Sequence, residues 1–489
     1  MVVGDTPSFI LKNTDENQSY YVIKNRAALI DLHKFKSVID SLNAFELTFC
    51  KTSPYTLIKN KIKYADHLIS VSDIYNNIRT FHLDNSGSLF VISVGKASVK
   101  MLTSIFDIFQ DRIEKSILIM PKGFSIERSD EYCLNKNKTI IIESSHPIPD
   151  INSLTAGEKV IELLLSTKKN DVIIFLISGG TSSLLVSPIE NLTLDDKRKI
   201  TSFLVTCGAN IVEINTVRKH LSKIKGGNML KYMSNDACVI SLIISDVIGD
   251  NIDTIGSGLT YFDNSTFLDA KIVLQKYSLL NKQDETMKKV YKLINLGIDS
   301  KLPETLKSIE YSQMNVNNFI MGNNNTFCNT LIKYFDLKGY DVDYLGSNCN
   351  KQISVFVNDC KTIFKKLRKK NCIIMGGEIT NIVDKNNNGV GGRNQEALSL
   401  LIDYIHNCNI DYDDYSIIFL GTDGIDGNSL MAGGLVSPKT LDILKRNEID
   451  IEKYINSYDS SNLFHRLKSC IMTGYTGTNV NDIYLFVRN

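Results

Sequence analysis

The chain has 489 residues, of which 43% are hydrophobic and 22% charged, so it is long enough for two or three domains with full cores. This length excludes a mini-protein or a disulfide scaffold. Its 55 basic and 54 acidic side chains leave a net charge of +1, which excludes a strong overall field for attracting nucleic acid. We therefore expect a small-molecule ligand, with no nucleic acid and no membrane as partner.

The ten cysteines are scattered, with no CxxC motif, so we expect reduced thiols. The N-terminal segment lacks the basic and apolar regions of a signal peptide, and no apolar run approaches the 18 residues needed to cross a bilayer. The expected location is the cytoplasm.

Residues 1–36 are polar and carry no motif, so they are predicted to be an N-terminal extension. After them, short apolar runs predict a first series of strands, at residues 89–95, 116–120, 139–143, 171–177 and 238–244. These runs are continuously apolar rather than alternating, which is typical of parallel strands that helices cover on both faces. The spacing leaves room for such helices, and residues 37–312 are predicted to be a Rossmann-like α/β domain.

Residues 263–315 have a polar, helical pattern and are the expected boundary region, with the join near residue 312. A second series of apolar runs follows, at residues 318–322, 372–377, 416–421, 470–474 and 482–488. Residues 313–489 are therefore predicted to be a second α/β domain. The expected fold is α/β, with two lobes of mainly parallel sheets flanked by helices and an active cleft between them.

Ligands of parallel α/β sheets gather at the carboxyl ends of the strands, so the residues that follow each run are informative. Lys96 follows the first strand and can neutralise a phosphate, although a surface lysine is the equal alternative. The next glycine-rich turn offers backbone N–H groups and hydroxyls to phosphate oxygens, or is simply a structural turn. Its candidate residues are Gly179, Gly180, Thr181, Ser182 and Ser183.

A basic segment at residues 214–230 is predicted to be a helix that Gly226 and Gly227 end. Arg218 and Lys225 would share one helical face with Ser222. This face either contacts a carboxylate or phosphate, or is solvated.

Carboxylates follow other strands. Asp246 and Asp250 are candidate Mg²⁺ ligands, or else they cap helices and turns. Further along the chain, Arg393 follows two glycines at an expected helix start, where it is well placed for bidentate contact with an anion. The other polar residues near strand ends here are Glu378, Asn394, Glu396, Asp423, Asp426, Thr476, Thr478, Asn479 and Asp482.

The order of these motifs resembles the class II glycerate kinases, whose carboxyl-terminal part is the MOFRL domain. The motifs that carry the resemblance are VGKAS, SSHPIPD, ISGGTSSLL, INTVRKHLSKIKGGNM, SDVIGD with IGSGLT, GGE with GVGGRNQE, GTDGIDG and TGYTGTNVND, over residues 40–489. The chain departs from the usual pattern at Leu259, at Ile379 and Asn381, and at Tyr475.

The resemblance implies transfer of the γ-phosphoryl group of ATP to D-glycerate, giving 2-phosphoglycerate, with Mg²⁺ as the metal. It suggests Lys96 and Arg393 as the pair in the active cleft, where they would stabilise the transferring phosphoryl group or hold the carboxylate of the acid. Our own hypothesis is that Asp246 and Asp250, helped by Asp423, hold the metal or accept the proton of the attacking hydroxyl, so that Asp246 is catalytic as well. The glycine-rich turn, Lys225, Asn394 and Glu396 are then expected to bind the nucleotide. The residues expected to contact the acid are His146, Arg218 and Asp423.

Two other functions stay open. An NAD(P)H-dependent hydroxypyruvate reductase is disfavoured because no GxGxxG motif follows a strand with an acidic residue about 20 positions later. A non-catalytic hydroxy-acid sensor on the same fold would bind glycerate without forming ADP. The chain is expected to be a monomer or a homodimer.

Overall fold

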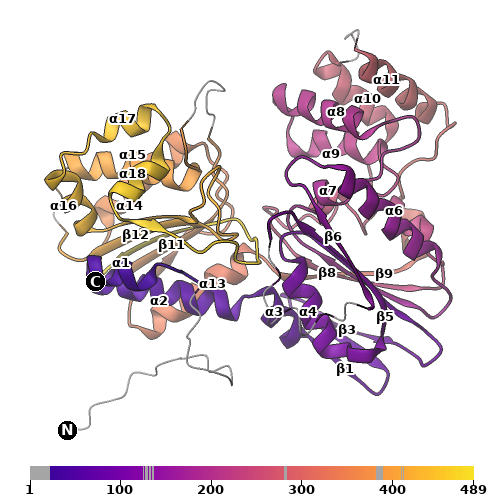
Figure 1. Ribbon diagram of the computed structural model, residues 1–489, viewed down its shortest axis with the longest axis horizontal. Coiled ribbons are helices and arrows are strands. Elements are labelled where there is room, and N and C mark those ends of the chain that lie inside the picture. The colour runs from indigo at the N-terminus through magenta and orange to yellow at the C-terminus, as the bar shows by residue number, and fades with distance from the viewer. Residues whose placement is uncertain are drawn as a thin grey trace.

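The computed structural model describes residues 22–124, 126, 130, 134, 137–279, 284–381, 389–408, 410 and 412–489. Two lobes lie side by side, each built on a six-stranded sheet with helices against it (Figure 1). The two-lobed α/β prediction is confirmed. Among the helices of the described residues, none has the length and apolar character needed to span a membrane.

The first sheet has the strand order β6-β5-β4-β7-β8-β9, and all of its neighbouring strands are parallel. The central strands β4, β7 and β8 are buried along their whole length, as their continuous apolar runs predicted. The strands are β4 (Leu89–Val94), β5 (Ile113–Pro121), β6 (Thr139–Ser144), β7 (Val172–Ile177), β8 (Cys238–Ile244) and β9 (Asn315–Gly322).

The assignment of residues 318–322 to the second lobe is wrong, and so is a join near residue 312. These residues belong to β9, which pairs in parallel with β8 and completes the first sheet. The helical segment before them therefore leaves the first sheet and returns to it. An apolar run buried on both faces fits either sheet, so its sequence did not reveal its neighbour.

Two helices of that segment and two helices from before β8 form a separate four-helix cluster above the first sheet (Figure 1), with an apolar core of its own. Its members are α8 (Leu194–Thr206), α9 (Ile211–His220), α10 (Phe267–Lys276) and α11 (Glu285–Ile298). The other helices of this lobe are α3 (Pro54–Lys61), α4 (Ser98–Phe109), α6 (Ile151–Leu165), α7 (Thr181–Leu184) and α12 (Ser308–Ser312). A small antiparallel sheet of β1 (Ile62–Ala65), β2 (Leu68–Ser72) and β3 (Ile78–His82) adjoins them.

The second sheet has the order β10-β11-β15-β12-β13-β14 and is mixed. The final strand β15 lies between β11 and β12 and is antiparallel to both, so it begins at the edge where those two strands end. The strands are β10 (Asp341–Tyr344), β11 (Asn371–Gly377), β12 (Tyr415–Gly421), β13 (Gly433–Val436), β14 (Cys470–Ile471) and β15 (Asp482–Arg488). Its helices are α13 (Asn324–Leu337), α14 (Ile353–Lys366), α15 (Arg393–Asn407), α16 (Pro438–Arg446), α17 (Ile451–Asn456) and α18 (Ser460–Arg466).

The N-terminal helices belong with the second lobe, although the sequence placed residues 37–312 in the first. Helix α2 (Lys36–Lys51) packs against α13, β12 and β15, and α1 (Arg26–His33) packs against α16 and α2. Figure 1 shows these helices in indigo beneath the orange and yellow lobe. Residues 1–21 of the predicted extension lie outside the described residues, whereas Ile23 is fully buried.

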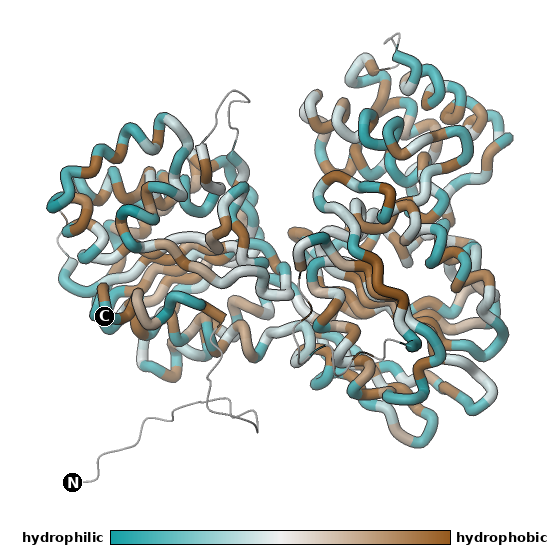
Figure 2. The backbone as a smooth tube through the Cα atoms, in the orientation of Figure 1, coloured by the Kyte–Doolittle hydropathy of each residue, from teal (hydrophilic) through white to brown (hydrophobic). Residues whose placement is uncertain are grey.

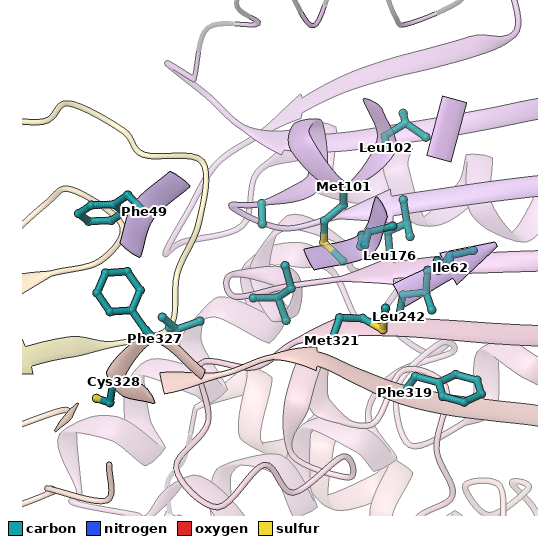
Figure 3. Packing of buried hydrophobic residues seen from close by; sticks show 14 of the residues in the cluster. Phe49, Ile62, Met101, Leu102, Leu176, Leu242, Phe319, Met321, Phe327 and Cys328 are labelled. Atoms are coloured by element: carbon teal, nitrogen blue, oxygen red, sulfur yellow. The ribbon is translucent and has the colours of Figure 1, made fainter. Parts of the chain in front are cut away.

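One apolar core runs through both lobes. Brown, hydrophobic strands occupy the middle of each lobe in Figure 2. The largest buried cluster contains first-sheet residues such as Leu176 and Leu242 together with second-lobe residues such as Phe327 and Ile418. Figure 3 shows Phe49 and Phe327 at the second-lobe end of this cluster and Met101, Leu176 and Leu242 at the other. The lobes are therefore joined by packed side chains, and this fixes how their strand ends face each other.

Candidate functional site

Three neighbouring strands of the first sheet end in the residues that carry chemistry. Lys96 follows β4, Gly179 follows β7 and Asp246 follows β8. The backbone N–H of Lys96 donates to the carbonyl of Gly179 at 2.8 Å, which joins the first two of these turns. Because parallel strands end at a common edge, residues far apart in the sequence are brought together, as the sequence predicted.

Gly179 is required at its position because two polar side chains press against it. A Cβ atom there would lie 2.1 Å from Asp246 Oδ2 and 2.7 Å from Asn479 Nδ2. Asn479 also donates from Nδ2 to Asp246 Oδ2, at 3.0 Å. Asn479 precedes β15 of the second lobe, so the two lobes meet at this turn.

A second interlobe contact is the ion pair between Lys96 and Asp423. Lys96 Nζ lies 2.6 Å from Asp423 Oδ2, and Asp423 follows β12 of the second sheet. The two side chains are only 18% and 16% exposed, so the pair is shielded from water and is stronger than a surface pair. Asp423 thus holds the ammonium group of Lys96 between the strand ends of the two sheets.

Arg393 begins α15 and is held by two carboxylates. Its Nε lies 2.5 Å from Asp482 Oδ2, and its Nη1 lies 2.6 Å from Glu378 Oε1. Asp482 starts the antiparallel strand β15 and lies in register with Gly377 and Gly421, where β11 and β12 end. Burial opposes the charge of Arg393, but the attraction of Asp482 and Glu378 outweighs it and raises the pKa of the guanidinium.

Asp246 connects these groups electrostatically. Burial raises the pKa of Asp246 to about 6, and Lys96 opposes the rise, while the negative charges of Glu378 and Asp423 add to it. Three charged side chains, from strand ends of both sheets, therefore act on one carboxyl group. We call Lys96, Asp246, Glu378, Arg393, Asp423 and Asp482 the interlobe site.

The hydroxyls of the glycine-rich turn are engaged within the protein. Thr181 Oγ1 donates to the carbonyl of Val94 at 3.2 Å and to that of Ser178 at 2.7 Å. Ser183 Oγ donates to the carbonyl of Gly180 at 3.1 Å, and Ser182 Oγ lies 2.8 Å from Ser257 Oγ. Their expected contacts with phosphate oxygens stay predictions. His146 lies at the same turn, because a Cβ on Gly180 would be 3.0 Å from its Cδ2.

Asp250 has a partner of its own. Its Oδ2 accepts a hydrogen bond from Asn323 Nδ2 at 2.6 Å, beyond the end of β9. Over the described ranges, no group of three or more His, Cys, Asp or Glu side chains is positioned to hold a metal ion. The pairing of Asp246 with Asp250 at one metal therefore stays a prediction.

Asn394 and Glu396 are turned inward. They are 1% and 5% exposed. Asp426 Oδ1 accepts from the backbone N–H of Asn394 at 3.1 Å and Asp426 Oδ2 from that of Gln395 at 2.8 Å, so this carboxylate caps α15 from outside the helix. The helix start predicted from GGRNQE is confirmed. Asn394 and Glu396 lie on the buried face of this helix, and their role in nucleotide binding stays a prediction.

The basic helix ends earlier than predicted, at His220 rather than at Gly226. Its continuation turns away because Ser222 bridges to Pro188 and the N–H of Lys223 donates to the carbonyl of Ser187 at 2.8 Å. Lys219 and His220 bind Asp263 and Glu304, so they are structural. In the part of the chain that the structure describes, Arg218 has no ion-pair partner, and Lys225 Nζ is buried without a hydrogen-bond partner.

Sequence reasoning gave no role to four residues that the structure places prominently. Glu378 and Asp482 were recognised only as polar residues near strand ends, and a carboxylate partner for Arg393 was not expected. Asn479 lies in the motif before β15, where its position next to Asp246 depends on the second lobe. Lys197, which is buried without a partner, lies in the charge-rich stretch DDKRK, which has the pattern of an exposed helix face.

Comparisons with known proteins agree with this architecture. Residues 40–292 match the model of a domain of unknown function, DUF4147, and residues 371–482 match the MOFRL family. A protein of Thermotoga maritima named D-glycerate 2-kinase is 34% identical over 409 residues, which are 82% of this chain and 91% of that protein. A protein of Agrobacterium vitis named putative hydroxypyruvate reductase is 31% identical over 412 residues, 81% of this chain and 86% of that protein.

A solved structure gives the same result for the fold. The crystal structure of a glycerate kinase from Thermotoga maritima superposes with a TM-score of 0.75 at 29% identity, and covers 92% of this chain and 99% of that chain. The order of the two matched domains, the extent of the sequence identity and the shared fold together define the relationship. The chain belongs to the glycerate 2-kinase family, in which a DUF4147 domain is followed by a MOFRL domain.

Proposed function

We propose that the protein transfers the γ-phosphoryl group of ATP to a hydroxyl of D-glycerate, giving 2-phosphoglycerate and ADP. The observation that carries this proposal is that two charges from different lobes act on the carboxyl group of Asp246: that of Lys96, and that of Glu378, which is paired with Arg393. Phosphoryl transfer depends on positioning and on neutralising charge, and both cations are held in place by carboxylates. The kinase names of the relatives and of the solved structure point to the same reaction.

Asp246 is the group best suited to accept the proton of the attacking hydroxyl. Its pKa of about 6 leaves it ionised at neutral pH but more basic than an ordinary aspartate. In the proposed step the glycerate oxygen forms a bond to the γ-phosphorus, and the bond from that phosphorus to the bridging oxygen breaks. The electron pair leaves with ADP, and the hydroxyl proton passes to Asp246. Lys96 and Arg393 stabilise the charge on the transferring group.

The carboxylates of the interlobe site fit a magnesium ion. Mg²⁺ binds in nucleotide enzymes through one or two carboxylates together with substrate phosphates, so Asp423 would suffice as a protein ligand and would leave Asp246 free to accept the proton. When bound, the ion would neutralise charge on the phosphates. Asp423 would then divide its charge between the ion and Lys96, which lies 2.6 Å away.

The name hydroxypyruvate reductase on a relative raises a second candidate reaction. The sequence disfavours it, because the turn after β4 reads GKAS and lacks the GxGxxG pattern for a dinucleotide. This turn places the side chain of Lys96 at the edge of the sheet, where a dinucleotide-binding turn has glycines that let the backbone approach the pyrophosphate. A glycerate sensor would keep the fold but would not need the buried Lys96–Asp423 pair.

A coupled ADP-release assay tests the proposal. We expect ADP formation with ATP, Mg²⁺ and D-glycerate, a ³¹P NMR signal of the 2-phosphate ester, and no NADH oxidation with hydroxypyruvate. Lys96→Ala and Arg393→Ala should each lower kcat on the order of 10²- to 10³-fold, as removal of a transition-state donor does. NADH oxidation without ADP release would support the reductase, and glycerate binding without either product would support the sensor.

A further inference from the structure

Three basic side chains gather beneath the four-helix cluster of the first lobe without compensating charge. They are Lys197 on α8, Arg218 on α9 and Lys225 in the turn that follows α9. Lys197 and Lys225 are 7% and 0% exposed, and within the described residues neither Nζ atom has a hydrogen-bond partner. An isolated buried ammonium group costs several kcal/mol unless it loses its proton or gains an anion, so a bound anion would stabilise the charged form of these lysines.

The three cations act on one another. Burial and the charge of Arg218 lower the pKa of Lys197 to about 7. Burial, Lys197 and Arg218 lower the pKa of Lys225 well below its ordinary value. No carboxylate of the described chain opposes either shift. Two other lysines of this region are paired with carboxylates. Lys219 pairs with Asp263, and Lys289 pairs with Asp196.

A chain of polar contacts connects this cationic cluster to the interlobe site. Gly179 touches Asp246, and three residues later Ser182 Oγ lies 2.8 Å from Ser257 Oγ. Ser257 Oγ in turn donates to Asn215 Oδ1 on α9, at 3.1 Å. Arg218 lies three positions after Asn215, hence on the same side of that helix. Lys225 is also connected to Ser257. The residue after it, Gly226, donates from its backbone N–H to the carbonyl of Ser257 at 3.0 Å.

We propose that Lys197, Arg218 and Lys225 form the anion site that binds the polyphosphate of the nucleotide. Arg218, whose surface is partly exposed, is the contact residue, and the two lysines lie behind it and supply positive charge. A polyphosphate carries enough negative charge to keep all three basic groups protonated when it binds, whereas the single carboxylate of a hydroxy acid would balance only one of them. The identity of the polyphosphate as that of ATP rests on the proposed function. The assignment moves Arg218 from the acid to the nucleotide and adds Lys197.

Binding measurements without turnover test this site. The probes are inorganic tripolyphosphate, ADP and D-glycerate, titrated separately into the full-length protein by calorimetry. Arg218→Gln should weaken ADP and tripolyphosphate on the order of 10- to 100-fold, the loss expected for a charged hydrogen-bonding group, and leave D-glycerate affinity unchanged. Lys223→Gln is the matched control in the same basic segment, since Lys223 is exposed and lies 3.9 Å from Glu190.

The lysine variants give a second signature. Lys197→Met and Lys225→Met keep roughly the length of the side chain and remove a buried amino group that has no hydrogen-bond partner, so each should raise Tm and weaken tripolyphosphate together. A purely structural lysine would lower Tm and leave the anion affinity unchanged. The proposal is overturned if the wild type does not bind tripolyphosphate, if the variants bind it as the wild type does, or if Arg218→Gln weakens D-glycerate instead of ADP. Loss of tripolyphosphate binding in the variants of a protein that releases no ADP would reject the kinase reaction and keep the anion site.

Discussion

Gly179 shows how little room the interlobe site leaves for one additional carbon. Asp246 and Asn479, which come from different lobes, both lie closer to the position of a Cβ atom than real side chains allow. The prediction is that Gly179→Ala displaces the Asp246 carboxylate and lowers kcat/KM at least 100-fold, because misplacement of a reacting group by about 1 Å has that effect. Steady-state kinetics at saturating ATP measure it.

Gly339→Ala is the control for this change. Gly339 has a positive φ of 74° and no atom within 4 Å of its Cβ position, so the substitution adds backbone strain without a steric clash. We expect it to lower Tm slightly and to leave kcat/KM unchanged. Equal kinetic effects of the two variants would contradict the role of the close approach at Gly179.

The raised pKa of Asp246 predicts the acid limb of the pH profile. A proton acceptor must be ionised, and burial with the charges of Glu378 and Asp423 raises this pKa to about 6. Activity should therefore be constant above pH 7 and fall about tenfold per unit below pH 6. The measurement is kcat against pH for the wild type and for Asp246→Asn.

The variant should retain only a residual rate that does not vary between pH 5 and 7. Asp299→Asn, which alters an exposed carboxylate 3.3 Å from Lys301, should keep the wild-type profile. If the residual activity of Asp246→Asn kept the same limb, the titrating group would have to be another one.

At the scale of the element, the sequence predicted where strands lie better than which strands pair with each other. Continuous apolar runs identified the strands β4 to β8, and the signal is strongest in the central strands β4, β7 and β8, which are buried on both faces. Pairing leaves no such signal, so β9 was assigned to the wrong sheet and the antiparallel direction of β15 was not foreseen. That direction places Asp482 beside Arg393.

The sequence predicted the site only in part for the same reason, because tertiary contacts leave no local signal. Strand-end position singled out Lys96 and Asp246, because the carboxyl edge of a sheet is a local consequence of chain direction. Arg393 was singled out by the two glycines before an expected helix start. Which strand-end residues turn inward depends on tertiary contacts, as Asn394 and Glu396 show. Lys197 gave no signal at all, since a lysine within a charge run on a helix is ordinarily solvated.

Glu396 on α15 and Asp426, which caps that helix from outside, are two buried carboxyl groups whose titration should control stability. Burial and the neighbouring Asp426 raise the pKa of Glu396 to about 7, and burial raises that of Asp426 to about 7. A carboxyl group whose pKa is higher in the folded state binds protons more tightly there, so the free energy of unfolding falls as pH rises from about 4 to 7. Glu396→Gln removes one of the two charges, and should stabilise the protein on the order of 1–2 kcal/mol at pH 8 and little at pH 5.

Chemical denaturation at the two pH values measures this difference. Glu448→Gln, a surface carboxylate in the same lobe, is the control and should change stability by the same small amount at both. A loss of stability for Glu396→Gln at pH 8 would mean that the ionised glutamate is compensated in the folded protein.

At the scale of the whole molecule, the interlobe site depends on a core that does not stop at the lobe boundary. The largest apolar cluster contains residues of β4, β7 and β8 together with residues of α2, α13, β12 and β15 (Figure 3). The stacked rings of Phe124 and Tyr475, 3.9 Å apart between centroids, add a contact between loops of the two lobes. The geometry that brings Lys96 to Asp423 is therefore set by packing at a distance from both residues.

Phe327 tests this coupling. It is 1% exposed, lies at the start of α13 and packs edge-on against Phe49 with 5.1 Å between ring centroids. Phe327→Ala should lower the free energy of unfolding by about 3–5 kcal/mol, as removal of a buried ring does, and should speed amide hydrogen exchange in β8 as well as in β12. Phe356→Ala is the matched control, because Phe356 is equally buried but belongs to a cluster formed by second-lobe helices and strands. It should speed exchange in β11, β12 and β15 and leave β8 protected. If Phe327→Ala affected the second lobe alone, the two lobes would be separate folding units, and the alignment of the interlobe site would have to come from its ion pairs and hydrogen bonds.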